Sequence, residues 1–271
     1  MKEQLNHIIT QLRGYYPEEE LLDLGYWIIE ETTGLNRTQI LTGCKVTEKI
    51  PNIEIILEKL RAHMPIQYVF EHTEWMGLDL RVTPQTLIPR PETAELIEWI
   101  LESVDRNQVI NVADIGTGSG CIAISLKKHR KQWNVCGMDI SQEALEVAKE
   151  NALRNQVQVN WKKVDILTEC IDKQDIIVSN PPYICDKEKK EMDARVLEYE
   201  PHRALFVPDS DPLLFYRRIA SLKAGKRLFF EINEAYGHEV CEMLEEMGYT
   251  NVILKHDMYG KPRMVFAAID C

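Results

Sequence analysis

The four residues Asn-Pro-Pro-Tyr at 180–183 follow the apolar run 176–178 after a single serine, Ser179. Each proline restricts the residue before it to an extended conformation, so Asn180 and Pro181 are both held straight. Proline also carries a carbonyl oxygen but no N–H group. We therefore expect two fixed hydrogen-bond acceptors, the side-chain oxygen of Asn180 and the backbone oxygen of Pro181, beside a flat apolar wall from Tyr183.

Two rigid acceptors match a planar –NH2 group, such as an amide or an exocyclic amine. The nitrogen of such a group is a poor nucleophile because its lone pair is delocalised. Fixing its two hydrogens can turn the lone pair toward an electrophilic methyl group, and such placement can lower a barrier by about 7–11 kcal/mol. The acceptors also stabilise the positive charge that develops on nitrogen. An ordinary turn at a strand end is the alternative interpretation of 180–183.

The segment 113–124, Ala-Asp-Ile-Gly-Thr-Gly-Ser-Gly-Cys-Ile-Ala-Ile, predicts a strand, a tight loop and a helix. Because Gly116, Gly118 and Gly120 lack a Cβ, the backbone can pass close to a ligand. The first turn of the helix offers N–H groups to an anionic ligand group. A dinucleotide site is the alternative, but its pattern is G-x-G-x-x-G, whereas this loop reads G-x-G-x-G with Asp114 two residues before it.

Two further aspartates come near the ends of the next predicted strands. Asp139 follows Gly116 by 23 residues, and a carboxylate there can accept hydrogen bonds from both hydroxyls of a ribose. A helix N-cap is the alternative role, for which Ser141 is an equally good candidate. Asp165 can accept from an adenine amino group, although by itself it would be a turn residue. Together these groups indicate an adenosine-bearing cofactor, and the loop spacing favours S-adenosylmethionine over a dinucleotide.

These residues need a sheet to position them, and from residue 109 onward predicted strands and helices alternate. The strands are predicted at 109–115, 134–138, 157–164, 175–179, 226–232, 250–256 and 263–269. The helices are predicted at 119–130, 141–154, 211–222 and 235–247. Such alternation predicts an α/β fold with a mostly parallel sheet and helices on both faces. The last two strands are too close in sequence for a crossover, so we expect them to pair antiparallel.

This seven-stranded, Rossmann-like layout is that of class I methyltransferases. Ligands collect at the switch point of such a sheet, where the first and fourth strands are neighbours.

The first third of the chain has a helical pattern instead. We predict a small helical bundle over 1–67, a short β-hairpin linker over 68–88, and a catalytic domain over 89–271. Residues 1–65 hold seven Lys and Arg against ten Asp and Glu, so the bundle is mildly acidic. The Pro-rich junction at 89–93 leads into an apolar helix.

Composition excludes several classes of protein. The net charge is −11 and the pI near 5.2, whereas a duplex DNA or RNA binder usually presents a basic face. No apolar run approaches the roughly 18–20 residues that cross a bilayer, so we expect no membrane association. The seven cysteines are scattered without a C-x-x-C pair, which argues against a disulfide framework or a zinc site. We expect no bound metal, and a reducing, cytoplasmic location.

At several of these motifs the chain resembles the release-factor glutamine methyltransferases. The segments that carry the resemblance are 86–99, 114–126, 138–141, 176–184, 197–206 and 257–267. The resemblance implies an enzyme that methylates the N5 nitrogen of glutamine in the Gly-Gly-Gln motif of class I peptide chain release factors. S-adenosylmethionine would be the methyl donor and S-adenosylhomocysteine the product.

The resemblance also implies roles for individual residues. The residues that would hold the cofactor are Asp114, Gly116, Thr117, Gly118, Ser119, Gly120, Asp139, Ile140, Asp165, Ile166 and Asn180. The glutamine would be held by Asn180, Pro181, Pro182 and Tyr183, and catalysis would rest on Asn180, Pro181 and Tyr183. The helical domain would help dock the protein substrate, and we expect a monomer without direct nucleic-acid contact. Glu200 either lines the substrate mouth or forms a salt bridge.

One departure from the family and three rival functions accompany this interpretation. Asn233 stands where the family more often has glycine, which changes little. An N6-adenine nucleic-acid methyltransferase would use the same Asn-Pro-Pro-Tyr chemistry on a flipped adenine. The acidic N-terminal segment lacks a recognisable nucleic-acid motif, so this function ranks second. A non-catalytic cofactor-binding scaffold ranks third and a dinucleotide oxidoreductase last.

Overall fold

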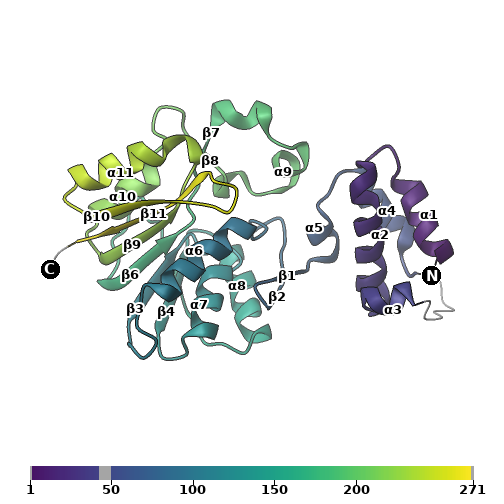
Figure 1. The fold of residues 1–271 in the computed structure, drawn as a ribbon, viewed down its shortest axis with the longest axis horizontal. Coiled ribbons are helices and arrows are strands. Elements are labelled where there is room, and N and C mark those ends of the chain that lie inside the picture. Colours follow the sequence, from purple (N-terminus) through teal and green to yellow (C-terminus); the bar gives the residue numbers. More distant parts are fainter. Residues whose placement is uncertain (1, 43–49, 270–271) are drawn as a thin grey trace. The chain divides into compact units, whose positions relative to one another are not determined.

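The computed structural model describes residues 2–42 and 50–269 of the chain. The chain divides into two compact units, Met1–Glu71 and His72–Cys271, and Figure 1 labels most of their elements. Within the described ranges, no helix is both long enough and apolar enough to cross a membrane. Cys44 and Cys271 lie outside the described residues.

The first unit is helical, as its sequence pattern predicts. Its described helices are α1 (Lys2–Leu12), α2 (Glu18–Thr33), α3 (Arg37–Leu41), α4 (Ile53–Arg61) and α5 (Ile66–Phe70). Three glutamates fill the first turn of α2, where negative charge complements the helix dipole. The helix ends at Gly34, which adopts a left-handed conformation. The apolar faces form one core, in which Leu12, Ile28 and Leu60 are completely buried.

The second unit is built around a seven-stranded sheet. Its strands are β3 (Asn111–Ile115), β4 (Asn134–Asp139), β5 (Asn160–Lys163), β6 (Gln174–Ser179), β9 (Gly225–Glu231), β10 (Thr250–His256) and β11 (Pro262–Ala268). Their order is β10-β11-β9-β6-β3-β4-β5. All seven predicted strands are present, and β10 and β11 pair antiparallel as predicted. Since β3 lies between β6 and β4 in parallel register, the Gly loop and the Asn-Pro-Pro-Tyr segment leave the same edge of the sheet.

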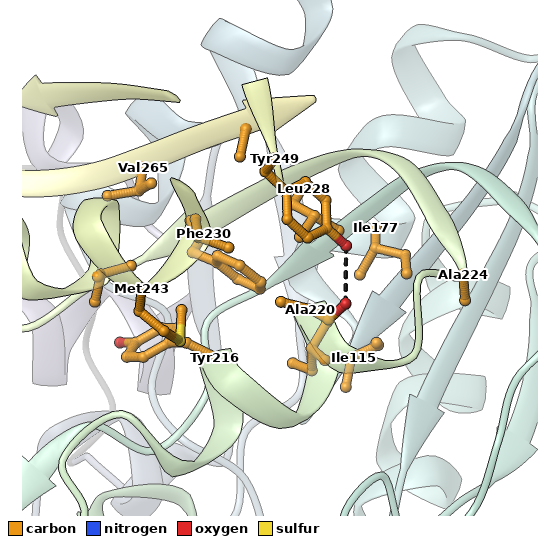
Figure 2. Close-up of a cluster of buried hydrophobic side chains, with 14 of the residues drawn as sticks. Ile115, Ile177, Tyr216, Ala220, Ala224, Leu228, Phe230, Met243, Tyr249 and Val265 are labelled. Carbon is orange, nitrogen blue, oxygen red and sulfur yellow. Dashed lines mark hydrogen bonds between the residues drawn. The ribbon is translucent and has the colours of Figure 1, made fainter. Parts of the chain in front are cut away.

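Helices cover both faces of this sheet. They are α6 (Pro91–Glu102), α7 (Cys121–His129), α8 (Gln142–Arg154), α10 (Leu214–Ser221) and α11 (Gly237–Glu246). Neighbouring residues of one strand point to opposite faces, so Ile176 packs with α6 and α7 whereas Ile177 packs with α10 and α11. Figure 2 shows part of the second of these layers, where the Tyr249 hydroxyl donates to the Ala220 carbonyl at 3.0 Å.

A short hairpin belongs to the second unit. Helix α5 continues to Phe70, and the antiparallel strands β1 (Thr73–Trp75) and β2 (Leu78–Leu80) follow it. Leu78 and Leu80 pack against Ile124 of α7 and Ala152 of α8. The side chain of Asn151 on α8 also donates to the Arg81 carbonyl at 2.9 Å. The hairpin is therefore fixed to the helices of the sheet.

Between β6 and α10 the chain forms several short elements that the sequence pattern did not indicate. They are β7 (Ile184–Cys185), the 3-10 helix η1 (Asp186–Glu191), α9 (Ala194–Tyr199), the 3-10 helix η2 (His202–Ala204) and β8 (Phe206–Val207). Another 3-10 helix, η3 (Glu234–Tyr236), precedes α11. The carbonyl of Leu205 accepts hydrogen bonds from the amides of Tyr183 and Ile184. These bonds hold the loop 199–205 beside the Asn-Pro-Pro-Tyr segment.

Candidate active site

A cavity of about 300 Å³ opens at the carboxyl edge of the sheet, beyond the ends of β3, β4 and β6. Most of the predicted site residues line it: Gly116, Thr117, Gly118, Ser119, Asp139, Ile140, Asp165, Ile166, Asn180, Pro181 and Pro182. Asp114, Gly120 and Tyr183 are not among its lining residues. Strands β6, β3 and β4 run parallel, so their carboxyl ends meet at one edge of the sheet. They bring together predicted residues as far apart in the sequence as Gly116 and Pro182, which are separated by 66 positions.

Gly116 and Gly118 form the floor of the cavity with positive φ angles of 72° and 54°. L side chains rarely adopt this conformation, so glycine is required there for the backbone itself. A Cβ on Gly116 would come no closer than 4.0 Å to any protein atom, the nearest being the Asn180 backbone oxygen. The space above the loop is therefore open for a ligand, which the spacing of the glycines predicts.

Gly120 has a different role from the one that we predicted. A Cβ on it would lie 3.0 Å from both Ala148 of α8 and Trp161 of β5. The missing side chain therefore makes room for the packing of α7 against its neighbours. Gly120 does not form part of the cavity wall.

Asp114 lies completely buried beneath the loop and not on the wall. One carboxyl oxygen, Oδ2, accepts from the Thr117 hydroxyl at 2.5 Å and from the Ala123 amide at 3.2 Å. No described residue donates to the other oxygen, Oδ1. Burial raises the pKa of this carboxyl to about 7, although the two hydrogen bonds oppose the shift. Asp114 therefore ties the loop to the start of α7.

Asp139 lines the cavity at the end of β4 and does not cap α8. Its Oδ2 accepts from the Gly118 amide at 2.9 Å and its Oδ1 from the Ser141 amide at 2.9 Å. The cap is Ser141, whose hydroxyl accepts from the Ala144 amide. Burial raises the pKa of Asp139, opposed first by the Ser141 and Gly118 amides. Each oxygen keeps a further lone pair, so the carboxylate can still accept from a pair of hydroxyls.

Asp165 closes a turn and also lines the cavity. Its oxygens accept from the Leu167 amide and the Thr168 hydroxyl, each at 3.0 Å, so it closes a turn. It also lines the cavity, beside the apolar side chains of Ile140 and Ile166. Ile140 is 48% exposed, which leaves an apolar surface that a flat ring can cover.

Asn180 stands at the rim of the cavity with one end of its amide fixed. Its Nδ2 donates to the Thr93 hydroxyl oxygen at 3.3 Å. None of the described residues donates to its Oδ1 or to the carbonyl of Pro181, which leaves the two predicted acceptors available. Asn180 Oδ1 and the Pro181 carbonyl are therefore the acceptors that the rim offers to a ligand, as the two prolines predict.

Tyr183 is turned away from the cavity wall on which we expected it. Its hydroxyl donates to Glu231 Oε1 at 3.2 Å, and its ring packs against the core cluster beneath α10 and α11. Its backbone oxygen accepts from the Asn233 side chain at 3.1 Å. A tyrosine with two polar anchors behind the rim supports the segment 180–182 from the inside.

Two residues to which sequence analysis assigned no role, Arg90 and Thr93, also meet at the rim. Arg90 lines the cavity, and its guanidinium donates to the buried Glu200 at 2.5 Å, which is the salt bridge that we kept as an alternative. Thr93 lines the cavity and donates to Glu231 at 2.6 Å. The Pro-Arg-Pro-Glu-Thr junction carries both Arg90 and Thr93. The motif could be recognised in the sequence, but its partners Glu200 and Glu231 could not, because they are distant in the chain.

The cysteine next to the glycine loop is not an activated nucleophile. Burial raises the pKa of the Cys121 thiol to about 12, and the charge of Asp114 adds to the shift. The thiolate form is therefore scarce at neutral pH.

Comparisons with known proteins agree with this geometry. The family model of the methyltransferase small domain matches residues 96–203. Among solved structures, a methyltransferase from Pyrococcus furiosus has a TM-score of 0.52 at 17% identity and covers 72% of this chain and 91% of that chain. The hMettl16 catalytic domain in complex with MAT2A 3′UTR hairpin 6 has a TM-score of 0.58 at 16% identity, covering 72% and 77%. These two similarities support the methyltransferase fold.

Two curated relatives are similar over almost their whole length. A release factor glutamine methyltransferase from Flavobacterium psychrophilum is 41% identical over 280 residues, covering 98% of both chains. One from Bacteroides thetaiotaomicron is 43% identical over 277 residues, covering 96% of this chain and 97% of the relative. Identity at this level, over nearly the full length of both units, shows that the chain belongs to the release factor glutamine methyltransferase family.

Proposed function

We propose that this chain methylates the N5 nitrogen of the glutamine in the Gly-Gly-Gln motif of class I peptide chain release factors, with S-adenosylmethionine as the methyl donor. The observation that carries the proposal is the rim: Asn180 Oδ1 and the Pro181 carbonyl are two acceptors, beside the cavity floor, to which no described residue donates. This pair suits the –NH2 group of a glutamine side chain.

The cavity fits a nucleoside cofactor by the chemistry of its donors and acceptors. The open space above Gly116 would be filled by any side chain at that position. Asp139 would accept from two ribose hydroxyls, and Ile140 and Ile166 would cover a base. The bound cofactor supplies a methyl group on a positively charged sulfur and leaves as S-adenosylhomocysteine.

The residues of the rim contribute to catalysis by orienting the glutamine amide. Asn180 Oδ1 and the Pro181 carbonyl each accept one hydrogen of the glutamine amide, which fixes the plane of the amide and the direction of its lone pair. Placement of this kind can supply about 7–11 kcal/mol of the barrier. As the nitrogen becomes positive, the same two oxygens stabilise the charge more strongly than in the ground state. One of its two hydrogens then leaves as a proton to solvent, which gives the neutral N5-methyl amide.

The remaining parts of the proposal concern the partner and its surroundings. The helical unit would dock the release factor, while the second unit carries the cavity. Since release factors act in translation, the enzyme would work in the cytoplasm, and we expect a monomer that contacts the protein substrate and not nucleic acid. The net charge of −11 is compatible with a partner that itself binds RNA.

The test is transfer of a radiolabelled methyl group to three substrates in parallel. These are a bacterial release factor, its Gln→Ala variant in the Gly-Gly-Gln motif, and adenine-containing DNA. We expect label on the first alone. Label on the DNA would replace the proposal with an N6-adenine methyltransferase, and label on none would favour a binding scaffold.

Asn180→Ala removes one acceptor of the rim without touching the cavity floor. We expect transfer to fall by about a hundredfold or more, as when one oriented group of a transition-state site is lost. Binding of S-adenosylhomocysteine, measured by calorimetry, should change little. Comparable turnover in the variant would remove the role given to Asn180.

A further inference from the structure

Behind Asn180 lies a buried chain of hydrogen bonds that the rim alone does not explain. It begins at Glu231, the last residue of β9, which is 1% exposed. Glu231 Oε2 accepts from the Thr93 hydroxyl at 2.6 Å, and Thr93 Oγ1 in turn accepts from Asn180 Nδ2 at 3.3 Å. The other oxygen, Oε1, accepts from the Tyr183 hydroxyl at 3.2 Å.

The sheet register places this carboxyl next to the rim. Ser179 of β6 pairs with Phe230 of β9, so Asn180 and Glu231 are the next residues along two neighbouring strands. Thr93 comes from the first turn of α6, which begins at Pro91, and it is 2% exposed. Three separate elements therefore converge on one short chain of polar atoms.

We propose that Glu231, acting through Thr93, determines which end of the Asn180 amide faces the cavity. A hydroxyl has one proton, and Thr93 donates it to the carboxylate. Thr93 can then meet Asn180 only with a lone pair, so the nitrogen of the amide must turn inward. The oxygen of the amide must then face the cavity. Glu231 and Thr93 are positioning residues in this scheme, because they act through Asn180.

Two hydroxyl donors and the guanidinium of Arg263 favour the ionised, accepting form of this carboxyl and oppose the effect of its burial. Burial raises the pKa of Glu231, and the hydrogen bonds from Thr93 and Tyr183 and the charge of Arg263 lower it. Burial also raises the pKa of the Tyr183 phenol, so this hydroxyl stays protonated and donates. With both carboxyl oxygens occupied by hydroxyl donors, the direction of every bond in the chain is set.

The consequence is selectivity for an –NH2 group. The two ends of an asparagine amide have nearly the same shape, so packing alone does not choose between them. A flipped Asn180 would point its own –NH2 at that of the glutamine, and the rim would lose its acceptor. The inference rests on the proposed function, since it assigns to Glu231 and Thr93 the preference of the same site for glutamine.

The first test uses near-isosteric substitutions in the full chain. Thr93→Val removes the hydroxyl, and Glu231→Gln allows residue 231 to donate as well as accept. We expect kcat for release-factor methylation to fall by about tenfold or more in each, the effect of losing a hydrogen bond to a charged group. KM and the affinity for S-adenosylhomocysteine should change less than kcat. Thr93→Ser keeps the hydroxyl and should recover most of the rate.

A matched control separates orientation from stability. Tyr249 is a buried tyrosine whose hydroxyl donates to the Ala220 carbonyl within the core (Figure 2). Tyr249→Phe also loses one buried hydrogen bond, but at a position away from the cavity lining. We expect its melting temperature to fall as in the other variants while its kcat is retained.

The second test reads the orientation of the amide directly. Binding is measured for the release factor and for its variant with Glu in place of the Gln of the Gly-Gly-Gln motif. The wild-type enzyme should prefer glutamine, because two acceptors repel a carboxylate. Glu231→Gln should narrow the ratio of the two dissociation constants, because its amide allows Asn180 to flip. A purely structural role for Glu231 would leave this ratio unchanged.

A third variant pair provides a rescue. In Asn180→Asp, a carboxylate oxygen faces the lone pair of Thr93, and turnover should fall. Adding Glu231→Gln lets Thr93 receive a proton from residue 231 and donate its own to the new carboxylate at position 180. The double variant should therefore turn over faster than Asn180→Asp alone.

The outcomes distinguish this inference from the proposed function. If the wild-type enzyme methylates the release factor, and Thr93→Val and Glu231→Gln keep its kcat and its preference for glutamine, the positioning role is wrong and the function stands. If the wild-type enzyme methylates no release factor, the function fails and the inference fails with it. Should Glu231→Gln not fold, Thr93→Val, which keeps the side-chain shape, decides the question by itself.

Discussion

The buried carboxyl of Asp114 makes stability depend on pH. Burial raises its pKa to about 7 from an ordinary value of 3.8, so the folded chain holds this proton more tightly than the unfolded chain. The stabilisation is fully present below pH 3.8 and is lost as the pH rises through 7. Each pKa unit corresponds to about 1.4 kcal/mol of unfolding free energy.

Asp114→Asn isolates this effect, since an amide does not titrate. We expect the wild-type unfolding free energy, measured in urea between roughly pH 5 and pH 8.5, to fall relative to that of the variant as the pH rises. The other titrating groups are shared and largely cancel in the difference between the two curves, apart from Asp139, whose charge interacts with that of Asp114. Parallel curves would show that Asp114 is ionised throughout this range.

At the scale of single residues, the sequence predicts a functional side chain best when that residue directly follows a predicted strand. Asp139 and Asn180 were found because each directly follows a predicted strand, 134–138 and 175–179. Thr93 and Glu231 were missed because their roles arise from a contact across 138 positions. A glutamate that ends an apolar strand, as Glu231 does, gives no local sign of which hydroxyl it meets.

At the scale of elements, one glycine determines how β4 and β5 fit together. Gly137 pairs with Trp161 of the neighbouring strand, and a Cβ on it would lie 2.3 Å from the Trp161 ring. Gly137→Ala should therefore force the indole or the strand to move and destabilise the chain by about 1–3 kcal/mol. The midpoint of urea unfolding measures this cost.

A double-mutant cycle identifies the cause. Trp161→Ala removes the ring that the new methyl group would meet. In that background Gly137→Ala should cost much less, and the difference is the interaction energy of the pair. An equal cost with and without Trp161 would mean that the Trp161 ring is not responsible, and that the Thr117 hydroxyl, 2.9 Å from the same Cβ, or the strand conformation is.

The elements themselves followed from the sequence wherever a periodic pattern was long enough. The strands that contain Ile176 and Phe229 are continuous apolar runs because both of their faces are covered. Between β6 and α10, the strands β7 and β8 escaped prediction because they have two residues each. Two residues cannot display a period, and only the pairing of Ile184 with Phe206 and of Cys185 with Val207 makes them strands.

At the scale of the whole molecule, the cavity belongs to one unit. Every lining residue falls between Gln85 and Phe215, inside the unit His72–Cys271. The segment 85–87, which we assigned to a linker, contributes to the wall. The hairpin before it covers Ile124 and Ala152. Residues 72–88 therefore form part of the core and of the cavity wall of the second unit, and are not only a linker between the two units.

Truncation of the helical unit provides the last prediction. A fragment of residues 72–271 retains the sheet, the hairpin and the whole cavity lining, so it should bind S-adenosylhomocysteine about as tightly as the full chain. It should also methylate a short peptide that contains Gly-Gly-Gln at a similar kcat/KM. With the complete release factor its kcat/KM should fall by about tenfold or more, because the docking contacts that we assign to the helical unit are lost.

A second fragment, residues 89–271, controls for the hairpin. It leaves Ile124 and Ala152 without the covering side chains of Leu78 and Leu80, and each large apolar side chain lost from a core costs about 2–5 kcal/mol. We therefore expect it to melt at a lower temperature than 72–271 and to bind the cofactor product more weakly. If 72–271 methylated the complete release factor as efficiently as the full chain, the helical unit would have no part in docking, and recognition would lie entirely at the rim.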